Sequence, residues 1–215
     1  MTSVALRRRS LLCIGLAGIG LLSEAVCAAP VSPSDVSSVI GPIQTLCDRL
    51  LDIMRAGHAA PFGQRFNMLA PAIDAAFDLE TILQFSIGAT WAGLPAEQKA
   101  ALRDAFRRYT IASYVDSFDQ FNGQRFVVLP DLRPVDNGEE VVQTHIISRD
   151  GDTHVLAYVM RNGSAGWRVV DVLEDGTISR VAVQRSDFRQ LLLRGGAPAL
   201  LESLQSKTAN LSDGA

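Results

Sequence analysis

The first half of the chain carries apolar residues at helical spacing, and the second half carries them at the spacing of strands. From Pro42 apolar side chains recur every three or four positions until Gly57 and Pro61, which predicts one helix ending there. The same spacing continues over residues 62–77. A break or kink is expected there at Pro71, because proline lacks the N–H of the helical hydrogen-bond ladder.

Two more helices are expected before the strands begin. One starts at Asp78 and runs towards Gly88, and the other starts near Pro95, which suits a first helical turn, and runs to about Phe121. The second carries two apolar stripes nearly opposite each other, which predicts either packing between two layers or burial all round. The stripes are Leu102, Ala105, Phe106 and Tyr109, and Ile111, Tyr114, Val115 and Phe118.

From Gln124 onward the pattern predicts four strands. They are expected over residues 125–133, 140–149, 153–162 and 166–174. Asp150-Gly151 and Asn162-Gly163 supply short turns, and turns of this kind join antiparallel neighbours. The strands should therefore form one antiparallel meander.

The chain returns to helix at its end. Ser186 predicts the start of one helix, Gly195-Gly196 its end and Pro198 the start of another, while residues 208–215 are polar and expected to form a flexible tail. We see no long linker, so residues 29–207 should form one domain. The predicted class is α+β, with a four-stranded twisted antiparallel sheet and about seven helices.

The N-terminal residues have the layout of a secretory signal peptide. A basic block, Arg7-Arg8-Arg9, precedes an apolar run of 12 residues over 11–22, and small residues lead to Ala28. The run is shorter than the ~20 residues of a membrane-spanning helix. We therefore predict cleavage near Ala28 and a mature protein outside the cytoplasm, exported by the general or the twin-arginine route. Neither Cys13 nor Cys27 has the setting of a lipid-anchored cysteine.

Charge and cysteine content exclude several classes of protein. The chain has 20 basic and 23 acidic residues, and residues 1–28 hold three Arg and one Glu, so the remainder has 17 against 22 and a net charge near −5. An acidic chain is a poor ligand for nucleic acid, whose binding needs Lys and Arg. Cys47 is alone after the predicted cleavage site, which excludes an intramolecular disulfide framework.

Catalytic and metal-binding groups are sparse. His145 and His154 lie on neighbouring predicted strands, but no Cys, Asp or Glu cluster accompanies them, so no metal site and no cofactor is expected. Asp171 follows an apolar strand and is the best candidate for a general acid or base in a small enzyme of the nuclear-transport-factor-like (NTF2-like) type. The alternative is that its carboxylate bonds the backbone or an arginine such as Arg168 or Arg185.

Short motifs in a fixed order along the chain suggest a family. In the helical half they are Phe62-Gly63-Gln64-Arg65-Phe66, Leu69-Ala70-Pro71, Phe77-Asp78, Gly88, Trp91 and Leu94-Pro95-Ala96-Glu97-Gln98. In the second half they are Val142-Gln143-Thr144, Tyr158, Trp167-Arg168-Val169-Val170-Asp171-Val172 and Arg185-Ser186-Asp187-Phe188. With this order the chain resembles the MlaC family of periplasmic phospholipid-binding proteins, also called toluene-tolerance proteins. The variant segment over residues 174–185 resembles its hopanoid-associated branch, HpnM.

The resemblance implies a function without catalysis. It implies an NTF2-like cone with an apolar cleft that takes the acyl chains of a phospholipid or hopanoid. It also implies handover in the periplasm between an inner-membrane ABC-type lipid transporter and an outer-membrane lipoprotein. The residues expected to contact lipid are Phe106, Tyr109, Tyr114, Phe118, Val142, Thr144, Ile146, Leu156, Tyr158, Met160 and Trp167. A lipid carrier is thus the first hypothesis, an enzyme that uses Asp171 the second, and an interaction module of an envelope complex the third.

Overall fold

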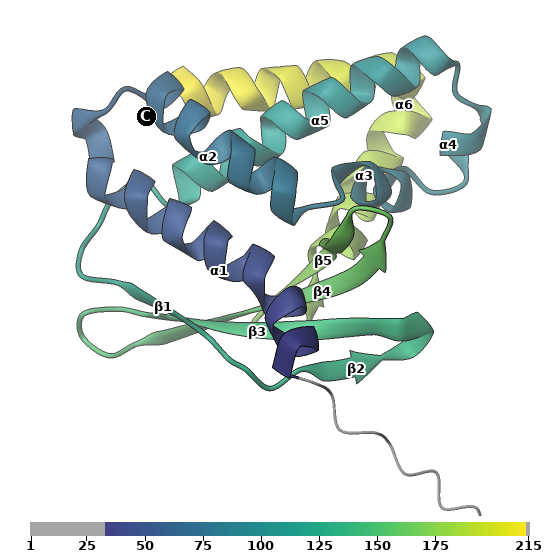
Figure 1. The fold of residues 1–215 in the computed structure, drawn as a ribbon. Coiled ribbons are helices and arrows are strands. Elements are labelled where there is room, and N and C mark those ends of the chain that lie inside the picture. The colour runs from purple at the N-terminus through teal and green to yellow at the C-terminus, as the bar shows by residue number, and fades with distance from the viewer. Residues whose placement is uncertain (1–32, 214–215) are drawn as a thin grey trace, which may run out of the picture. The chain divides into compact units, whose positions relative to one another are not determined.

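Helices α1, α2 and α5 lie on one side of an antiparallel sheet (Figure 1). The computed structural model describes residues 33–213, which belong to a unit spanning Val31–Ala215. The predicted export signal, residues 1–28, lies outside the described residues. The predicted α+β class and the antiparallel sheet are confirmed.

Six α-helices are found in the described part of the chain, against about seven predicted. They are α1 (Pro33–Ala56), α2 (Phe62–Ala76), α3 (Leu79–Ile87), α4 (Thr90–Gly93), α5 (Ala96–Ser117) and α6 (Arg180–Asp213). Helix α1 starts before the predicted Pro42, and α2 continues through Pro71, whose side chain is exposed. Short 3₁₀ turns follow α1 at Gly57–Ala59 and precede the third strand at Asp136–Gly138.

Helix α6 contains both predicted C-terminal helices, whereas α4 was not predicted and α2 is not broken at Pro71. Gly195 and Gly196 have non-helical backbone angles and bend it at the predicted boundary. It begins six residues before Ser186, since Ser179 Oγ accepts the N–H of Ala182 at 2.9 Å and so supplies the cap. It ends at Asp213, so the helix includes most of the segment expected to form a flexible tail.

The predicted number of strands is wrong, because residues 33–213 form six. They are β1 (Arg125–Val128), β2 (Arg133–Val135), β3 (Glu139–Ile147), β4 (Thr153–Gly163), β5 (Gly166–Glu174) and β6 (Ile178–Ser179). The expected strand over 125–133 is split into β1 and β2, which pair with different parts of β3. The break follows the bond from Leu129 N–H to the Gln143 carbonyl, where Pro130 has no N–H to continue the ladder. Strand β6 is two residues long, which is too short to show the alternation of apolar and polar residues by which a strand is predicted from sequence.

The sheet order is β1-β3-β4-β5-β6, with β2 also on β3. The register pairs Val142 with Tyr158, Thr144 with Leu156 and Ile146 with His154. Paired residues project from the same face of a sheet, so these side chains share one face. They share it with Val172, which pairs with Tyr158 across β5.

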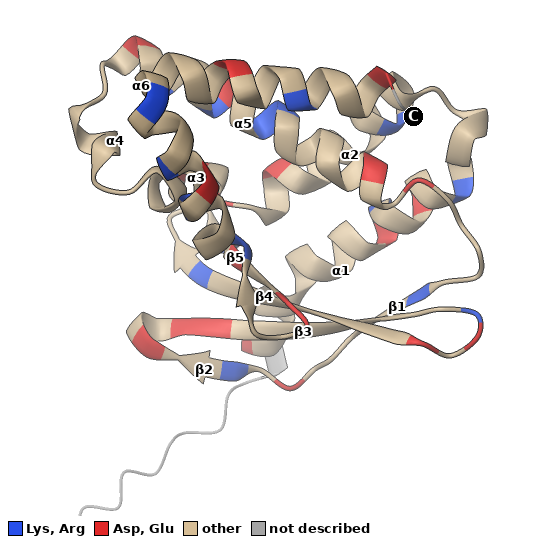
Figure 2. Ribbon diagram, turned by 180° about the vertical axis from the view of Figure 1, so that it is seen from behind, with Lys and Arg blue, Asp and Glu red and all other residues tan. Residues whose placement is uncertain are grey.

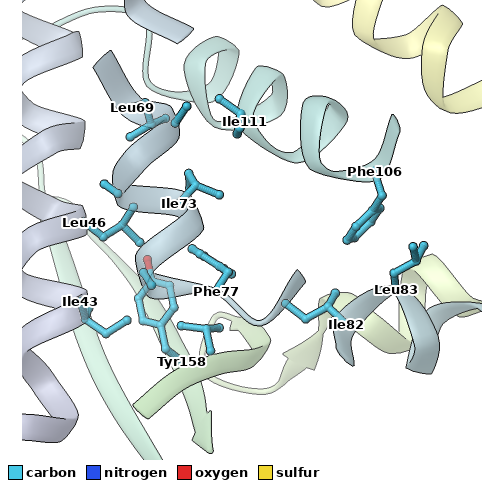
Figure 3. Packing of buried hydrophobic residues seen from close by; sticks show 14 of the residues in the cluster. Ile43, Leu46, Leu69, Ile73, Phe77, Ile82, Leu83, Phe106, Ile111 and Tyr158 are labelled. Carbon is cyan, nitrogen blue, oxygen red and sulfur yellow. The ribbon is translucent and has the colours of Figure 1, made fainter. Parts of the chain in front are cut away.

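A buried apolar cluster fills the space between α1, α2 and the sheet. Figure 3 shows Tyr158 beside Ile43 and Leu46 of α1, and Ile73 of α2 on the same side. All four side chains have no exposed surface. Burying a side chain of this size contributes roughly 1.5–3 kcal/mol, so this half of the domain supplies much of the stability.

Charged residues lie mostly on the outer surfaces of the helices and at the ends of the sheet (Figure 2). Arg107 of α5 donates two hydrogen bonds to Asp74 of α2, at 2.7 and 2.6 Å, and these bonds raise the pKa of the guanidinium. The pair is exposed enough that it contributes little beyond orienting the two helices. None of the helices described here is both long and apolar enough to cross a membrane.

Candidate functional site

A cavity of about 540 Å³ lies between α5, the start of α6 and the sheet. Its volume falls in the range of small-molecule sites, roughly 300–1,000 Å³. Its wall is mainly apolar and comes from α1, α3, α5, α6 and the strands. The apolar and aromatic lining residues are Met54, Phe77, Leu79, Ile82, Phe106, Tyr109, Tyr114, Phe118, Ile146, Leu156, Val172 and Val181.

One stripe of α5 forms a wall of this cavity. Lining residues recur at helical spacing through Phe106, Thr110, Ser113 and Ser117, with Tyr109 beside them. The side chain of Phe106 reaches α3 and stands edge-on to Phe188 of α6, whereas Ile111 lies towards α2 (Figure 3). The helix therefore packs between two layers, as the first reading of its stripes predicts, and it also presents a face to the cavity.

Aromatic rings stiffen this wall. Tyr114 stands edge-on to Phe77 with ring centroids 5.6 Å apart and stacks on Phe118 at 6.0 Å, and Phe118 meets Phe126 at 5.8 Å. Such pairs stabilise one another by about 0.5–1.5 kcal/mol beyond area burial. Burial raises the pKa of Tyr114 well above its ordinary value, so the ring presents a neutral hydroxyl.

The structure divides the residues predicted for lipid contact into two groups. Around the cavity lie Phe106, Tyr109, Tyr114, Phe118, Ile146 and Leu156. Outside its lining lie Val142, Thr144, Tyr158, Met160 and Trp167.

The residues of the second group are packed against other side chains instead of facing the cavity. Val142, Tyr158 and Met160 belong to the core cluster and have no exposed surface, because α1 and α2 pack over this part of the sheet. Thr144 is equally buried, and its hydroxyl donates to the Leu156 carbonyl at 3.1 Å. Trp167 is half-buried against the same core. In this structure none of these side chains meets open space in the cavity.

Asp171 organises the corner where β5, β6 and α6 meet. Its Oδ1 accepts the N–H of Val172 at 2.8 Å and that of Val181 at 3.1 Å, and its Oδ2 accepts the hydroxyl of Ser179. Both carboxylate oxygens are thus used to hold the first turn of α6 against the sheet. These are the backbone bonds expected of a structural carboxylate, and Arg168 and Arg185 do not contribute to them.

Polar groups line the remainder of the cavity. Arg180 donates to Glu174 at 2.9 Å, and Asp119 lies 3.4 Å from Nε2 of His58. Gln184 is held by Ser86, whose hydroxyl oxygen lies 3.1 Å from the amide oxygen. The other polar lining residues are Thr110, Ser113, Ser117, Gln120, Asn122, Gln124, Ser148 and His154.

The histidines do not assemble a metal site. His145 pairs with Val155 and His154 with Ile146, so the two rings project from opposite faces of the sheet. Across residues 33–213 no group of three or more His, Cys, Asp or Glu side chains is placed to hold a metal ion.

Sequence reasoning missed the polar half of the lining. Thr110, Ser113 and Ser117 follow Phe106 at the spacing of one helical face, and this period was the available signal. A search for apolar stripes passes over them because they are hydroxyl residues. Arg180 and Glu174 could not be found in this way, since their positions depend on how β6 leads into α6.

Comparison with known proteins identifies the family. The family model described as MlaC protein matches residues 44–206. This chain belongs to the MlaC family. Among solved structures, the MlaC-family fold found here is similar to that of a phospholipid-binding protein from Ralstonia solanacearum, determined in complex with a phospholipid. The TM-score is 0.69 and the identity 20%, over 81% of this chain and 98% of the other. No match is found among curated proteins.

Proposed function

We propose that this protein is a lipid carrier of the periplasm, which shields the acyl chains of a phospholipid or hopanoid during transfer between the inner and outer membranes. The observation that carries the proposal is the cavity of about 540 Å³, walled by apolar and aromatic side chains. Membership of the MlaC family and the similar fold of a phospholipid-bound protein support it. In this role the sheet and helices form the wall of an NTF2-like cone.

The physics of transfer explains why such a protein needs a cavity and no catalytic group. Exposing each methylene to water costs about 0.8 kcal/mol, so a lipid with about 30 methylenes faces roughly 25 kcal/mol. Free passage through water is negligible at that cost. The carrier does not need this energy as net affinity, which would exceed the practical limit of about 20 kcal/mol. It needs only an environment comparable to the bilayer, which non-directional apolar contact provides.

The size of the cavity limits how much hydrocarbon enters it. At roughly 30 Å³ per methylene-sized group, the volume of one water molecule in the liquid, 540 Å³ holds about 18 groups. One acyl chain fits this space. A second chain requires α5 and the start of α6 to move away from the sheet, or stays outside.

The proposal includes two transport partners, which the resemblance to the family implies. An ABC-type lipid transporter of the inner membrane and a lipoprotein of the outer membrane would exchange lipid with this carrier. The signal-like residues 1–28 support export. The segment over residues 174–185, which contributes Glu174, Arg180 and Gln184 to the cavity, is where the chain resembles the hopanoid-associated HpnM branch, so a hopanoid stands beside a phospholipid as the proposed cargo.

The test is to identify what the purified protein carries. Organic extraction followed by mass spectrometry should yield one lipid per protein molecule. An Ile146→Trp variant should lose this lipid, because the indole occupies the cavity. The control is His145→Trp, one residue along on the opposite face of β3, which should carry normal lipid. Absence of lipid from the unmodified protein, or normal loading of Ile146→Trp, would contradict the proposal.

A further inference from the structure

The cavity opens to solvent between three parts of the chain. Its lining residues are mostly buried or half-buried, and those with exposed side chains are Ser117, Gln120, Asn122, His154 and Arg180. They come from the end of α5 and the α5–β1 loop, from the start of β4 and from the first residue of α6. These positions therefore mark the mouth of the cavity.

Exposed apolar side chains border this mouth on two of its sides. Phe121 lies between Gln120 and Asn122 in the α5–β1 loop and is 41% exposed. Ile178 is 50% exposed and pairs with the lining residue Glu174, so it projects from the cavity face of the sheet at the β6 edge. Neither Phe121 nor Ile178 is part of the lining. The rim of the mouth therefore carries apolar surface that no other part of residues 33–213 covers.

The charges around the mouth are of both signs. Six carboxylates and three guanidiniums lie in the segments 116–125, 148–154 and 174–183. Arg55 of α1 adds a cation, because its guanidinium lies over the ring of Phe121, 5.4 Å from the centroid. Lys207 of α6 adds another, over the ring of the lining residue Tyr109 at 5.8 Å. Nearly equal numbers of the two signs complement the phosphate and ammonium groups of a zwitterionic head-group layer.

We propose that the mouth of the cavity docks directly on the surface of a zwitterionic phospholipid bilayer, with Phe121 and Ile178 inserted among the head groups. This inference rests on the proposed function, since the cargo of a lipid carrier lies in a bilayer. An acyl chain stays out of water during transfer only where the mouth meets the lipid surface, and both side chains lie at that contact. The ring of Phe121 can enter the acyl boundary while the guanidinium of Arg55 stays with the phosphates.

Docking of this kind is weak and depends little on salt. Membrane affinity scales with the apolar area that is inserted, and two side chains insert little, so the protein can leave the bilayer again after exchange. Because the rim has no excess of cations, binding does not require anionic lipid. The fraction bound to vesicles should therefore be similar at low and at high salt, whereas attraction between a basic surface and anionic lipid is screened by salt.

Transfer kinetics test the docking. The purified protein carries a fluorescent phosphatidylcholine from donor to acceptor vesicles of dioleoyl phosphatidylcholine, and co-flotation with the same vesicles measures binding. The double variant Phe121→Ser/Ile178→Ser should lose at least about fivefold in both binding and transfer rate, because it removes the inserted apolar area. The amount of lipid per protein at equilibrium should be unchanged, since neither side chain lines the cavity. A change of rate without a change of equilibrium loading separates docking from the cavity itself.

The matched control is Met68→Ser/Leu193→Ser, which removes two exposed apolar side chains outside the rim, on α2 and near the bend of α6. It should keep the binding and the rate of the unmodified protein, and circular dichroism establishes that both double variants fold.

Four outcomes count against the docking. A full rate in the rim variant, equal losses in both variants, or reduced equilibrium loading of the rim variant overturns it and leaves the carrier function standing. So does transfer by the unmodified protein that needs an added protein and proceeds without vesicle binding, which would assign the rim to a protein partner. If the unmodified protein neither holds nor transfers lipid, both proposals are overturned.

Discussion

One face of the sheet meets two different environments. Val142, Tyr158 and Met160 lie under α1 and α2 with no exposed surface, whereas Ile146, Leu156 and Val172 border a cavity. Some of these residues are neighbours on the same strands, and their apolar character is similar. The difference arises above the sheet, where Ile43 and Leu46 of α1 pack on one region (Figure 3), whereas the side chains of α5 and the start of α6 leave a cavity over the other. The cavity therefore forms where part of the apolar sheet face is not covered by closely packed side chains from a helix.

The largest effect expected from this comparison is on stability. Leu46→Ala removes packing from the filled region and should cost about 2–5 kcal/mol of unfolding free energy. Leu156→Ala lies at the open region, where few neighbours are lost, and should cost less than about 1.5 kcal/mol, the lower end of burial values. Urea denaturation of both variants measures the two costs. Equal losses would mean that the cavity is packed as tightly as the core.

The second effect concerns the stability of the region around the cavity. Because packing is reduced there, we expect specific hydrogen bonds such as those of Asp171 to carry more of the local stability. Asp171→Asn should cost roughly 1.5–3 kcal/mol, the range for hydrogen bonds to a charged group. Asp187→Asn, at an exposed position of α6, should stay within about 0.5 kcal/mol. Denaturation at pH 7 distinguishes them, and a neutral Asp171→Asn would show that the corner does not depend on this carboxylate.

The third effect is a pH dependence in the filled region. Burial raises the pKa of Tyr158 well above its ordinary value and that of the Cys47 thiol to about 12. In alkali the unfolded chain releases these protons and the folded chain retains them. The free energy of unfolding should therefore be unaffected below about pH 8 and fall above pH 10, by about 1.4 kcal/mol per pH unit for the tyrosine alone.

Tyr158→Phe tests this dependence. Within residues 33–213 the polar neighbour of the buried Tyr158 hydroxyl is Thr144, whose own hydroxyl already donates to the Leu156 carbonyl, so removal of the Tyr158 hydroxyl should cost little at pH 8. At pH 11 the variant should be more stable than the unmodified protein by about 1.4 kcal/mol, one pH unit of linkage. The measurement is urea denaturation of both proteins at the two pH values. The same difference at pH 8 and pH 11 would show that Tyr158 does not resist ionisation in the folded state.

The middle of the sheet was predictable from the sequence, and its edges were not. The expected strands 140–149, 153–162 and 166–174 correspond closely to β3, β4 and β5, because Gly-containing turns mark their ends. Strand β6 and the early start of α6 depend on Ser179 and Asp171, which are brought together only by the folded sheet. Local patterns do not contain such information.

The same limit applies to the cavity. The residues of α5 predicted to contact lipid all lie at its wall, together with Phe118 just beyond the helix, although they come from both of its apolar stripes. On the sheet only Ile146 and Leu156 do so, although Val142, Thr144, Tyr158 and Met160 were expected beside them. Alternation along a strand indicates which residues share a face. It does not indicate how far α1 extends over that face.

The most direct test of the account is to locate hydrocarbon in the molecule. Crystals of the protein loaded with a lipid brominated on one acyl chain would show the bromine positions by anomalous scattering. We expect these peaks within the lining, among Phe106, Tyr114 and Leu156. Peaks confined to the outer surface, with ordered water between α5 and the sheet, would contradict it.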